Sequence, residues 1–136
     1  MPAPNEEVVR GVIVASPFGS LLGLQVERVE ADRVGVRLPY RPAITTVGDT
    51  VHGGAVASLI DVAATAAAWS AADLGRSRRG TTIGFTVNFL APARAQDLVA
   101  TARVIRRGGT ICVCEVAVDG ADGAALARAL VTYKLG

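Results

Sequence analysis

The chain has 136 residues, of which 51% are hydrophobic and 19% are charged, and its formal net charge is +2. This length fits one domain with a sizeable core. The small net charge gives no indication of a nucleic-acid partner, and the apolar surplus favours an oligomer that buries further surface. Residues 1–7 have no basic region ahead of an apolar run, so we expect no secretory signal and a cytoplasmic protein.

The two cysteines, Cys112 and Cys114, stand one residue apart. On a strand this spacing points both thiols to one face and does not suit a mutual disulfide. With a single distant histidine they do not complete a zinc site. We interpret them as small buried side chains in a reducing compartment, and we expect no metal and no cofactor.

Taken in chain order, the pattern begins with Asn5 as the cap of a short helix through about residue 14, which the Ser-Pro-Phe-Gly segment at 16–19 ends. A long alanine-rich helix is expected over about 53–73, and Asp61 in its middle argues for a core helix over a membrane span. Alternating apolar residues and glycine turns predict strands at 24–29, 34–38, 81–90, 97–106, 111–118 and 125–135. This order predicts one α+β domain over residues 1–136, with a sheet wrapped on one dominant helix.

The stretch from His52 to Asp61 contains the only histidine and leads into the long helix. Gly53 and Gly54 would be its first residues, where backbone N–H groups have no internal partner and carry the positive end of the helix dipole. Such a site stabilises a developing oxyanion. The alternative is that the two glycines are only a loose start to the helix.

Asp61 lies among apolar residues and shares one helical face with Ser58 and Thr65. A carboxylate in such a run is rarely buried without a partner or a task, although a solvated polar face would also explain it. Asp61 follows Gly53 by eight residues, which is roughly 12 Å along a helix. If both groups act on one carbonyl, they must therefore come from two chains across a two-fold dimer interface.

No Gly-x-Ser-x-Gly nucleophile motif, dinucleotide fingerprint or P-loop is present. With its His-Gly-Gly segment and Asp61, the chain resembles the hotdog-fold acyl-CoA thioesterases, in particular the phenylacetate/4-hydroxybenzoyl-CoA branch. The resemblance extends to residues 17–23, to the Val-Asn-Phe-Leu-Ala-Pro-Ala segment at 87–93, to the Arg-Arg-Gly-Gly turn at 106–109 and to residues 132–134. It implies a curved antiparallel sheet around one central helix, a homodimer and often a dimer of dimers. It also implies hydrolysis of an aryl- or medium-chain acyl-CoA, with no membrane partner.

The resemblance also implies roles for individual residues. The Gly53 N–H would polarise the thioester carbonyl, and Asp61 of the partner subunit would act as nucleophile or general base. His52 would orient the substrate or the loop, although a purely structural histidine is equally compatible with the sequence. Thr82 matches a hydroxyl that positions the attacking water. The remaining substrate contacts would come from Thr46, Gly54, Phe89, Arg106, Arg107, Gly108, Gly109, Thr110 and Lys134.

Two departures from the family pattern concern substrate handling: Thr46 stands where many members have asparagine, and Gly84 where many have aspartate. The arginines at 76, 78 and 79 are either a solvated loop or a second contact to the CoA phosphates. Two rival functions use the same fold. One is a non-catalytic acyl-CoA binding module, which needs no carboxylate at the thioester. The other is an enoyl-CoA hydratase, which needs a second acid or base.

Overall fold

The computed structural model of the chain describes residues 4–136. The first residues of the N-terminal stretch, 1–3, lie outside the described part. The helical elements are α1 (Glu6–Val8), the π-helical turn η1 (Val9–Val14), α2 (Pro17–Leu22), the 3-10 turn η2 (Pro42–Ile44) and the long helix α3 (Gly53–Ser70). The strands are β1 (Gln25–Glu30), β2 (Arg33–Leu38), β3 (Gly80–Phe89), β4 (Leu98–Arg107), β5 (Ile111–Gly120) and β6 (Ala125–Leu135).

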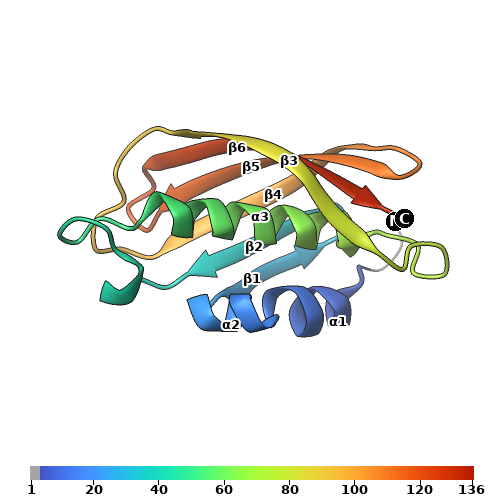
Figure 1. The fold of residues 1–136 in the computed structure, drawn as a ribbon, viewed down its shortest axis with the longest axis horizontal. Coiled ribbons are helices and arrows are strands. Elements are labelled where there is room, and N and C mark those ends of the chain that lie inside the picture. Colours follow the sequence, from blue (N-terminus) through green and yellow to red (C-terminus); the bar gives the residue numbers. More distant parts are fainter. Residues whose placement is uncertain (1–3) are drawn as a thin grey trace.

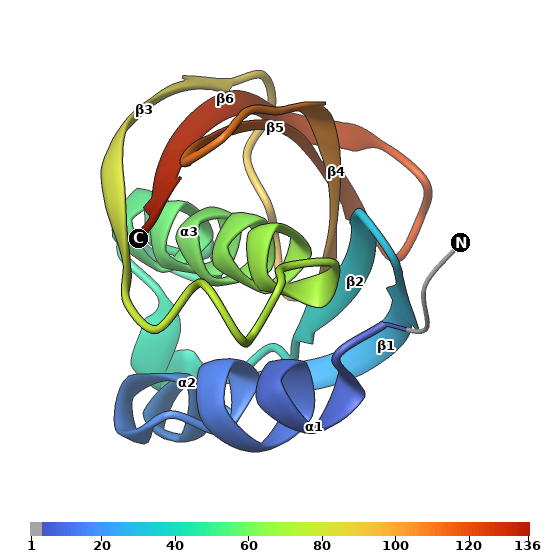
Figure 2. The same ribbon diagram turned by 90° about the vertical axis from the view of Figure 1, so that its right-hand side faces the viewer.

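The strands form one antiparallel sheet in the order β1-β2-β4-β5-β6-β3. The sheet lies along the length of α3 (Figure 1) and curves around it, while α1, η1 and α2 lie beneath the gap between β1 and the helix (Figure 2). The predicted α+β class and hotdog fold are confirmed. The strand predictions agree with the structure to within about two residues, because the alternating residues on them face the helix and the solvent in turn.

The core lies between α3 and the concave face of the sheet. Leu59 and Ile60 are fully buried, and so are most of the alanines of α3. Alanine has little volume, so the sheet approaches the helix backbone closely; the thiol of Cys114 lies 3.7 Å from the Ala64 carbonyl oxygen. The length and composition of α3 would suit a membrane span, but more than half of it is buried inside the domain, as expected of a core helix. Both cysteines are free and buried, as predicted.

Strand β3 is the exception to this burial. It lies at one edge of the sheet, paired only with β6, and most of its residues are exposed. Ile83, Phe85 and Phe89 are exposed by 58%, 37% and 56%. An edge strand that presents large apolar side chains and free backbone groups is a surface suited to pairing with another strand.

Three local predictions were wrong. Ser16 begins a helix instead of ending one, since its Oγ accepts the Gly19 N–H at 3.1 Å and Pro17 occupies the first turn of α2. Asn5 makes no side-chain cap to its own helix; its Nδ2 donates to the carbonyl oxygens of Trp69 and Ala72, at 2.8 and 2.9 Å. The third concerns the long helix α3, which ends at Ser70, about three residues earlier than predicted.

Candidate active site

The first turn of α3 leaves one backbone donor available. His52 is the N-cap: its Nδ1 accepts the Gly54 N–H at 2.7 Å, and its carbonyl oxygen accepts the N–H groups of Ala55 and Val56 at 2.9 and 3.2 Å. Within residues 4–136 the Gly53 N–H has no hydrogen-bond acceptor. The positive end of the helix dipole is thus presented through a single N–H group.

The hydrogen bond of His52 also defines its tautomer. Nδ1 is the acceptor, so the proton of the neutral ring resides on Nε2. The predicted role of His52 in ordering the loop is consistent with this contact. Its ring is exposed, so Nε2 stays available to a ligand.

A hollow of about 340 Å³ opens beside Gly53. A β-carbon placed on Gly53 would lie 3.6 Å from the Phe89 ring, so Phe89 forms the opposite wall. Thr46 lies at the rim, where its N–H donates to the Thr50 carbonyl oxygen at 2.8 Å. The other walls are mostly apolar and include Val51, Val56, Leu90, Pro92, Ala93 and Leu126. Gly53, the first residue of the helix, therefore lines a mostly apolar hollow.

A second hollow, of about 240 Å³, lies on the His52 side of the same turn. Phe18 of α2 and Ile44 of η2 line it, together with Gly54 and Ser58. The Ser58 Oγ donates to the Gly54 carbonyl oxygen at 2.8 Å, which fixes that side chain against the helix. Sequence analysis missed this wall because it did not predict α2.

Two turns further along α3, Asp61 is half-buried and faces β3. The Thr82 Oγ1 donates to Asp61 Oδ1 at 2.7 Å, so the structure brings together two residues of the predicted site. This charge-assisted hydrogen bond uses one acceptor site of Oδ1 and orients the carboxylate. A carboxylate held in this way can attack a carbonyl carbon or accept a proton from water.

Next to Asp61 lies an aromatic pair that sequence analysis did not assign to the site. Trp69 Nε1 donates to the Tyr133 hydroxyl at 2.9 Å. Burial raises the pKa of Tyr133, and the charge of Asp61 adds to the increase, while the Trp69 hydrogen bond opposes it. Any side chain at Gly80, at the start of β3, would overlap the Tyr133 ring. The glycine at this position is therefore a sequence signal that another side chain packs against the backbone there.

The predicted CoA-contacting turn lies between β4 and β5. Arg106 is exposed, Gly109 is exposed in the turn, and the Gly108 N–H donates to the Ile111 carbonyl oxygen at 2.8 Å. The Thr110 carbonyl oxygen accepts the Leu135 N–H at 2.7 Å, which joins the turn to the C-terminal end of β6 beside the exposed Lys134.

Arg107 is placed differently from its neighbour. Its Nε and Nη2 donate to Asp32 Oδ1 at 3.1 and 2.7 Å, and its Nη2 also donates to the Ala68 carbonyl oxygen at 3.0 Å. The guanidinium group therefore holds the end of α3 to the β1–β2 turn. In this arrangement Arg106 is the arginine of the turn that faces solvent.

Gly53 and the β4–β5 turn lie at opposite ends of the domain, with α3 running between them (Figure 1). Thr82 lies near the end with the turn, because it pairs with Tyr133, the neighbour of Lys134, and it bonds Asp61 in the middle of α3. Within one chain, the structure thus brings Asp61 to Thr82 and Gly53 to Phe89, but it does not bring these two pairs together.

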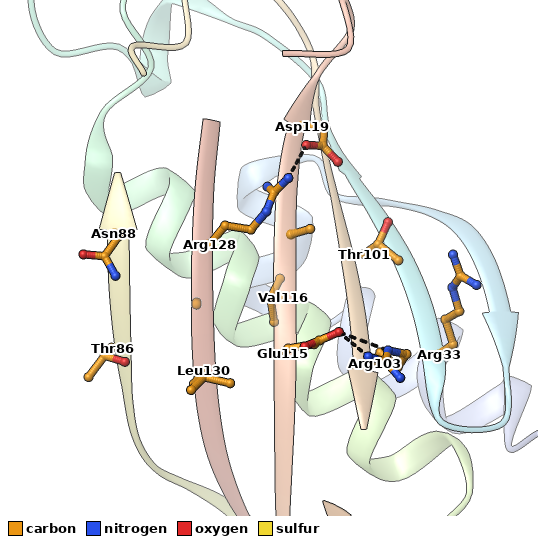
Figure 3. A pocket seen from close by; sticks show the side chains of 12 residues that line it. Arg33, Thr86, Asn88, Thr101, Arg103, Glu115, Val116, Asp119, Arg128 and Leu130 are labelled. Atoms are coloured by element: carbon orange, nitrogen blue, oxygen red, sulfur yellow. Dashed lines mark hydrogen bonds and ion pairs between the residues drawn. The ribbon is translucent and has the colours of Figure 1, made fainter. Parts of the chain in front are cut away.

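A third hollow, of about 660 Å³, lies on the face of the sheet turned away from α3 (Figure 3). Its charged side chains are largely paired: Arg103 Nε lies 3.1 Å from Glu115 Oε1, and Arg128 Nη2 lies 3.2 Å from Asp119 Oδ1. It contains none of the predicted site residues. We therefore place the candidate active site at α3 and β3.

Comparison with known proteins shows the family of the chain. A family model described as the Thioesterase superfamily matches residues 48–127. The medium/long-chain acyl-CoA thioesterase YigI of Salmonella typhimurium is 32% identical, over 88% of this chain and 86% of that protein. The Escherichia coli YigI is 30% identical over the same shares.

Solved structures show the same fold. A thioesterase family protein from Silicibacter pomeroyi superposes with a TM-score of 0.88 at 28% identity, covering 96% of each chain. The PaaI protein of the Escherichia coli phenylacetic acid degradation operon superposes with a TM-score of 0.81 at 20% identity, covering 90% of this chain and 86% of that one.

Proposed function

Because the chain belongs to the thioesterase superfamily and is a thioester hydrolase, we propose that it cleaves aryl- or medium-chain acyl-CoA to the free acid and CoA. The observation that carries this proposal is that α3 carries both an N-terminal N–H without an acceptor among residues 4–136, at Gly53, and a carboxylate oriented by a hydroxyl, at Asp61. The similarity to YigI supports the medium-chain end of this range. The reaction needs no cofactor, since CoA is part of the substrate.

In the proposed reaction the thioester carbonyl oxygen accepts the Gly53 N–H. Negative charge develops on that oxygen as the carbonyl carbon is attacked, and the N–H and the helix dipole stabilise it. Asp61 either removes a proton from the attacking water or attacks directly and forms an anhydride that water then hydrolyses. In both routes the carbon–sulfur bond breaks, and the CoA sulfur leaves with its electron pair and takes up a proton.

We further propose that each site spans two subunits. Gly53 lies beside Phe89, at one end of β3, whereas Asp61 is bonded to Thr82, near the other end. If the exposed edge of β3 pairs antiparallel with β3 of a second copy, the Phe89 end of one strand meets the Thr82 end of the other. Gly53 of one chain would then face Asp61 of its partner, and the exposed apolar side chains of β3 would be covered. A dimer of dimers is the expected further assembly.

A complementation experiment tests the two-subunit site. Asp61→Asn and Gly53→Pro chains with different tags are expressed together, and the mixed dimer is purified. Each variant alone is expected to lose roughly 10²–10⁴-fold in kcat. The mixed dimer is expected to recover one competent site of two, measured as thiol release from acyl-CoA esters. A site contained within one chain would recover none, and that outcome would contradict the proposal.

The substrate is tested by a panel of acyl-CoA esters with a free-thiol reagent. Acyl chains of medium length and phenylacetyl and benzoyl esters are compared by kcat/KM. Release of CoA thiol is expected with at least one of these classes. Loss of enoyl absorbance without thiol release would instead indicate hydratase chemistry, and binding without either would indicate a binding module.

A further inference from the structure

Strand β3 contains one residue more than its pairing with β6 uses. Thr82 pairs with Tyr133 and Gly84 pairs with Thr132, so Ile83 between them has no partner. An extra residue of this kind is a β-bulge. Because side chains on a strand alternate between two faces, a bulge reverses the alternation on one side of it relative to the other. The bulge therefore decides which side chains at the start of β3 face α3.

The side chains on the two sides of the bulge show this reversal. After the bulge, Val87 packs against the core, whereas Thr86 and Asn88 line the hollow on the far face of the sheet (Figure 3). Before the bulge, the alternation is the opposite one, since Thr82 faces α3 and bonds Asp61. If the alternation of Val87 continued without interruption, the Thr82 side chain would lie on the far face, away from Asp61.

A strand without the bulge is the competing arrangement, which we call the slipped register. In it, Ile83 takes the place of Thr82, and Thr81 takes the place of Gly80. The Ile83 side chain, which is 58% exposed, would be buried against α3, and the ladder of backbone hydrogen bonds would have no interruption. Apolar burial and backbone pairing therefore both favour the slipped register, in which Asp61 has no hydroxyl partner.

A close contact at the start of β3 excludes the slipped register. The Tyr133 ring lies directly against Gly80, where a β-carbon would be 2.6 and 2.8 Å from the ring atoms Cε1 and Cζ. The ring is held in this position from the helix, since Trp69 Nε1 donates to the Tyr133 hydroxyl at 2.9 Å. Thr81 has a β-carbon, so it cannot take the place of Gly80 while the ring stays there. Only glycine fits this position.

We propose that the contact between Gly80 and the Tyr133 ring, held by Trp69, sets the register of the start of β3. In that register the Thr82 hydroxyl reaches Asp61, so the contact determines how the carboxylate is oriented. The consequence for catalysis rests on the proposed function. Gly80, Tyr133 and Trp69 are positioning residues, which act on Asp61 through Thr82. Because Trp69 and Asp61 belong to the same helix, α3 fixes the strand that orients its own carboxylate.

A glycine at position 81 tests this role. In Thr81→Gly, the residue that would meet the Tyr133 ring in the slipped register has no β-carbon, so that register becomes accessible. Ile83 then replaces Thr82 beside Asp61. We expect kcat for an acyl-CoA ester to fall by about fivefold, toward the loss expected for Thr82→Val. The matched control is Thr81→Ala, which keeps the β-carbon and should stay within about twofold of the wild-type kcat.

A second substitution separates a slip of the register from a general loosening of the strand. In Thr81→Gly/Ile83→Thr, the slipped register presents the hydroxyl of the substituted residue 83 to Asp61. We expect kcat to return to within about twofold of the wild-type value. Thr81→Gly/Ile83→Val has nearly the same shape without the hydroxyl, so its kcat is expected to stay low. Recovery in both double variants or in neither would overturn the proposal, as would equal activity of Thr81→Gly and Thr81→Ala.

The register is also measured without activity, from nuclear Overhauser contacts of the Tyr133 ring. In the wild-type protein and in Thr81→Ala, the ring is expected to contact the α-protons of Gly80. In Thr81→Gly it is expected to contact those of residue 81, and an unchanged Gly80 contact there would overturn the proposal. If the contacts change as expected but the wild-type protein hydrolyses no thioester, the register assignment stands and the proposed function fails.

Discussion

The two ends of α3 are built in opposite ways. At the C-terminal end, the last carbonyl oxygens all accept hydrogen bonds. The Ser70 Oγ donates to the Ala67 carbonyl oxygen and Arg107 donates to that of Ala68. The backbone and side-chain N–H groups of Asn5 donate to the carbonyl oxygens of Trp69, Ser70 and Ala72. At the N-terminal end, the Gly53 N–H has no acceptor among residues 4–136, and Gly53 lines an apolar hollow. One end anchors the helix in the domain, and the other keeps its dipole available to a ligand.

The largest expected effect comes from removing the free N–H. In Gly53→Pro, proline occupies the first helical position, where its ring is tolerated, and His52 already has the extended conformation (φ −61°, ψ 134°) that precedes proline. The fold should persist while kcat falls roughly 10²–10³-fold, measured by thiol release. Gly53→Ala retains the N–H and places its methyl group 3.6 Å from Phe89, an ordinary contact, so it should retain most activity. Equal losses in both variants would show that the N–H is not the oxyanion donor.

Substitutions at the C-terminal end of α3 are expected to change the free energy of unfolding. Arg107→Met leaves Asp32 and the Ala68 carbonyl oxygen without their partner, so the free energy of unfolding is expected to fall by about 1–3 kcal/mol, measured by denaturant titration. Arg103→Met breaks the Arg103–Glu115 pair, whose side chains are 56% and 49% exposed, and should cost less than about 1 kcal/mol. Similar losses in the two variants would mean that the Arg107 contacts do not anchor α3.

Between the two ends, Thr82→Val keeps the shape of the side chain and removes the hydroxyl that bonds Asp61. A hydrogen bond to a charged group contributes about 1.5 kcal/mol or more, so we expect kcat to fall about tenfold. The control is Thr86→Val, on the outward-facing side of the same strand, where the hydroxyl lines the hollow on the far face. Unchanged turnover in Thr82→Val would show that Asp61 is oriented by other groups.

The smallest effect at neutral pH concerns Cys114, whose thiol packs against the middle of α3. Burial raises its pKa from the ordinary value of 9.0 to about 12. Between pH 9 and pH 12 the folded state therefore keeps the thiol proton, whereas the unfolded chain has lost it. Stability is fully present below pH 9 and falls as the pH rises toward 12, by about 1.4 kcal/mol per pH unit for one proton. Cys114→Ala should reduce this slope in unfolding titrations, and an unchanged slope would mean that other groups cause it.

Local rules predicted most of the fold. Alternation placed β4, β5 and β6, because each of these strands has one face against α3 and the other in solvent. The errors have two causes: a side chain that bonds a distant segment, and a local signal that has the opposite meaning. Asn5 is a good helix cap by type, but its amide reaches Trp69 and Ala72 instead. Ser16-Pro17 is a helix-start signal that was interpreted as a helix end.

By itself, the sequence determined the α+β class, and it placed Gly53 at the start of the long helix and Asp61 eight residues later. That separation prevents one helix from aligning both residues on one carbonyl. These follow from residue type and spacing along one element. Only the tertiary structure decided that Thr82 bonds and orients Asp61 and that Tyr133 and Trp69 lie beside this carboxylate. It also decided that Arg107 forms an ion pair with Asp32 and that β3 is an exposed edge strand. Such pairings join residues far apart in the chain, and which of two neighbouring arginines faces inward depends on the strand register.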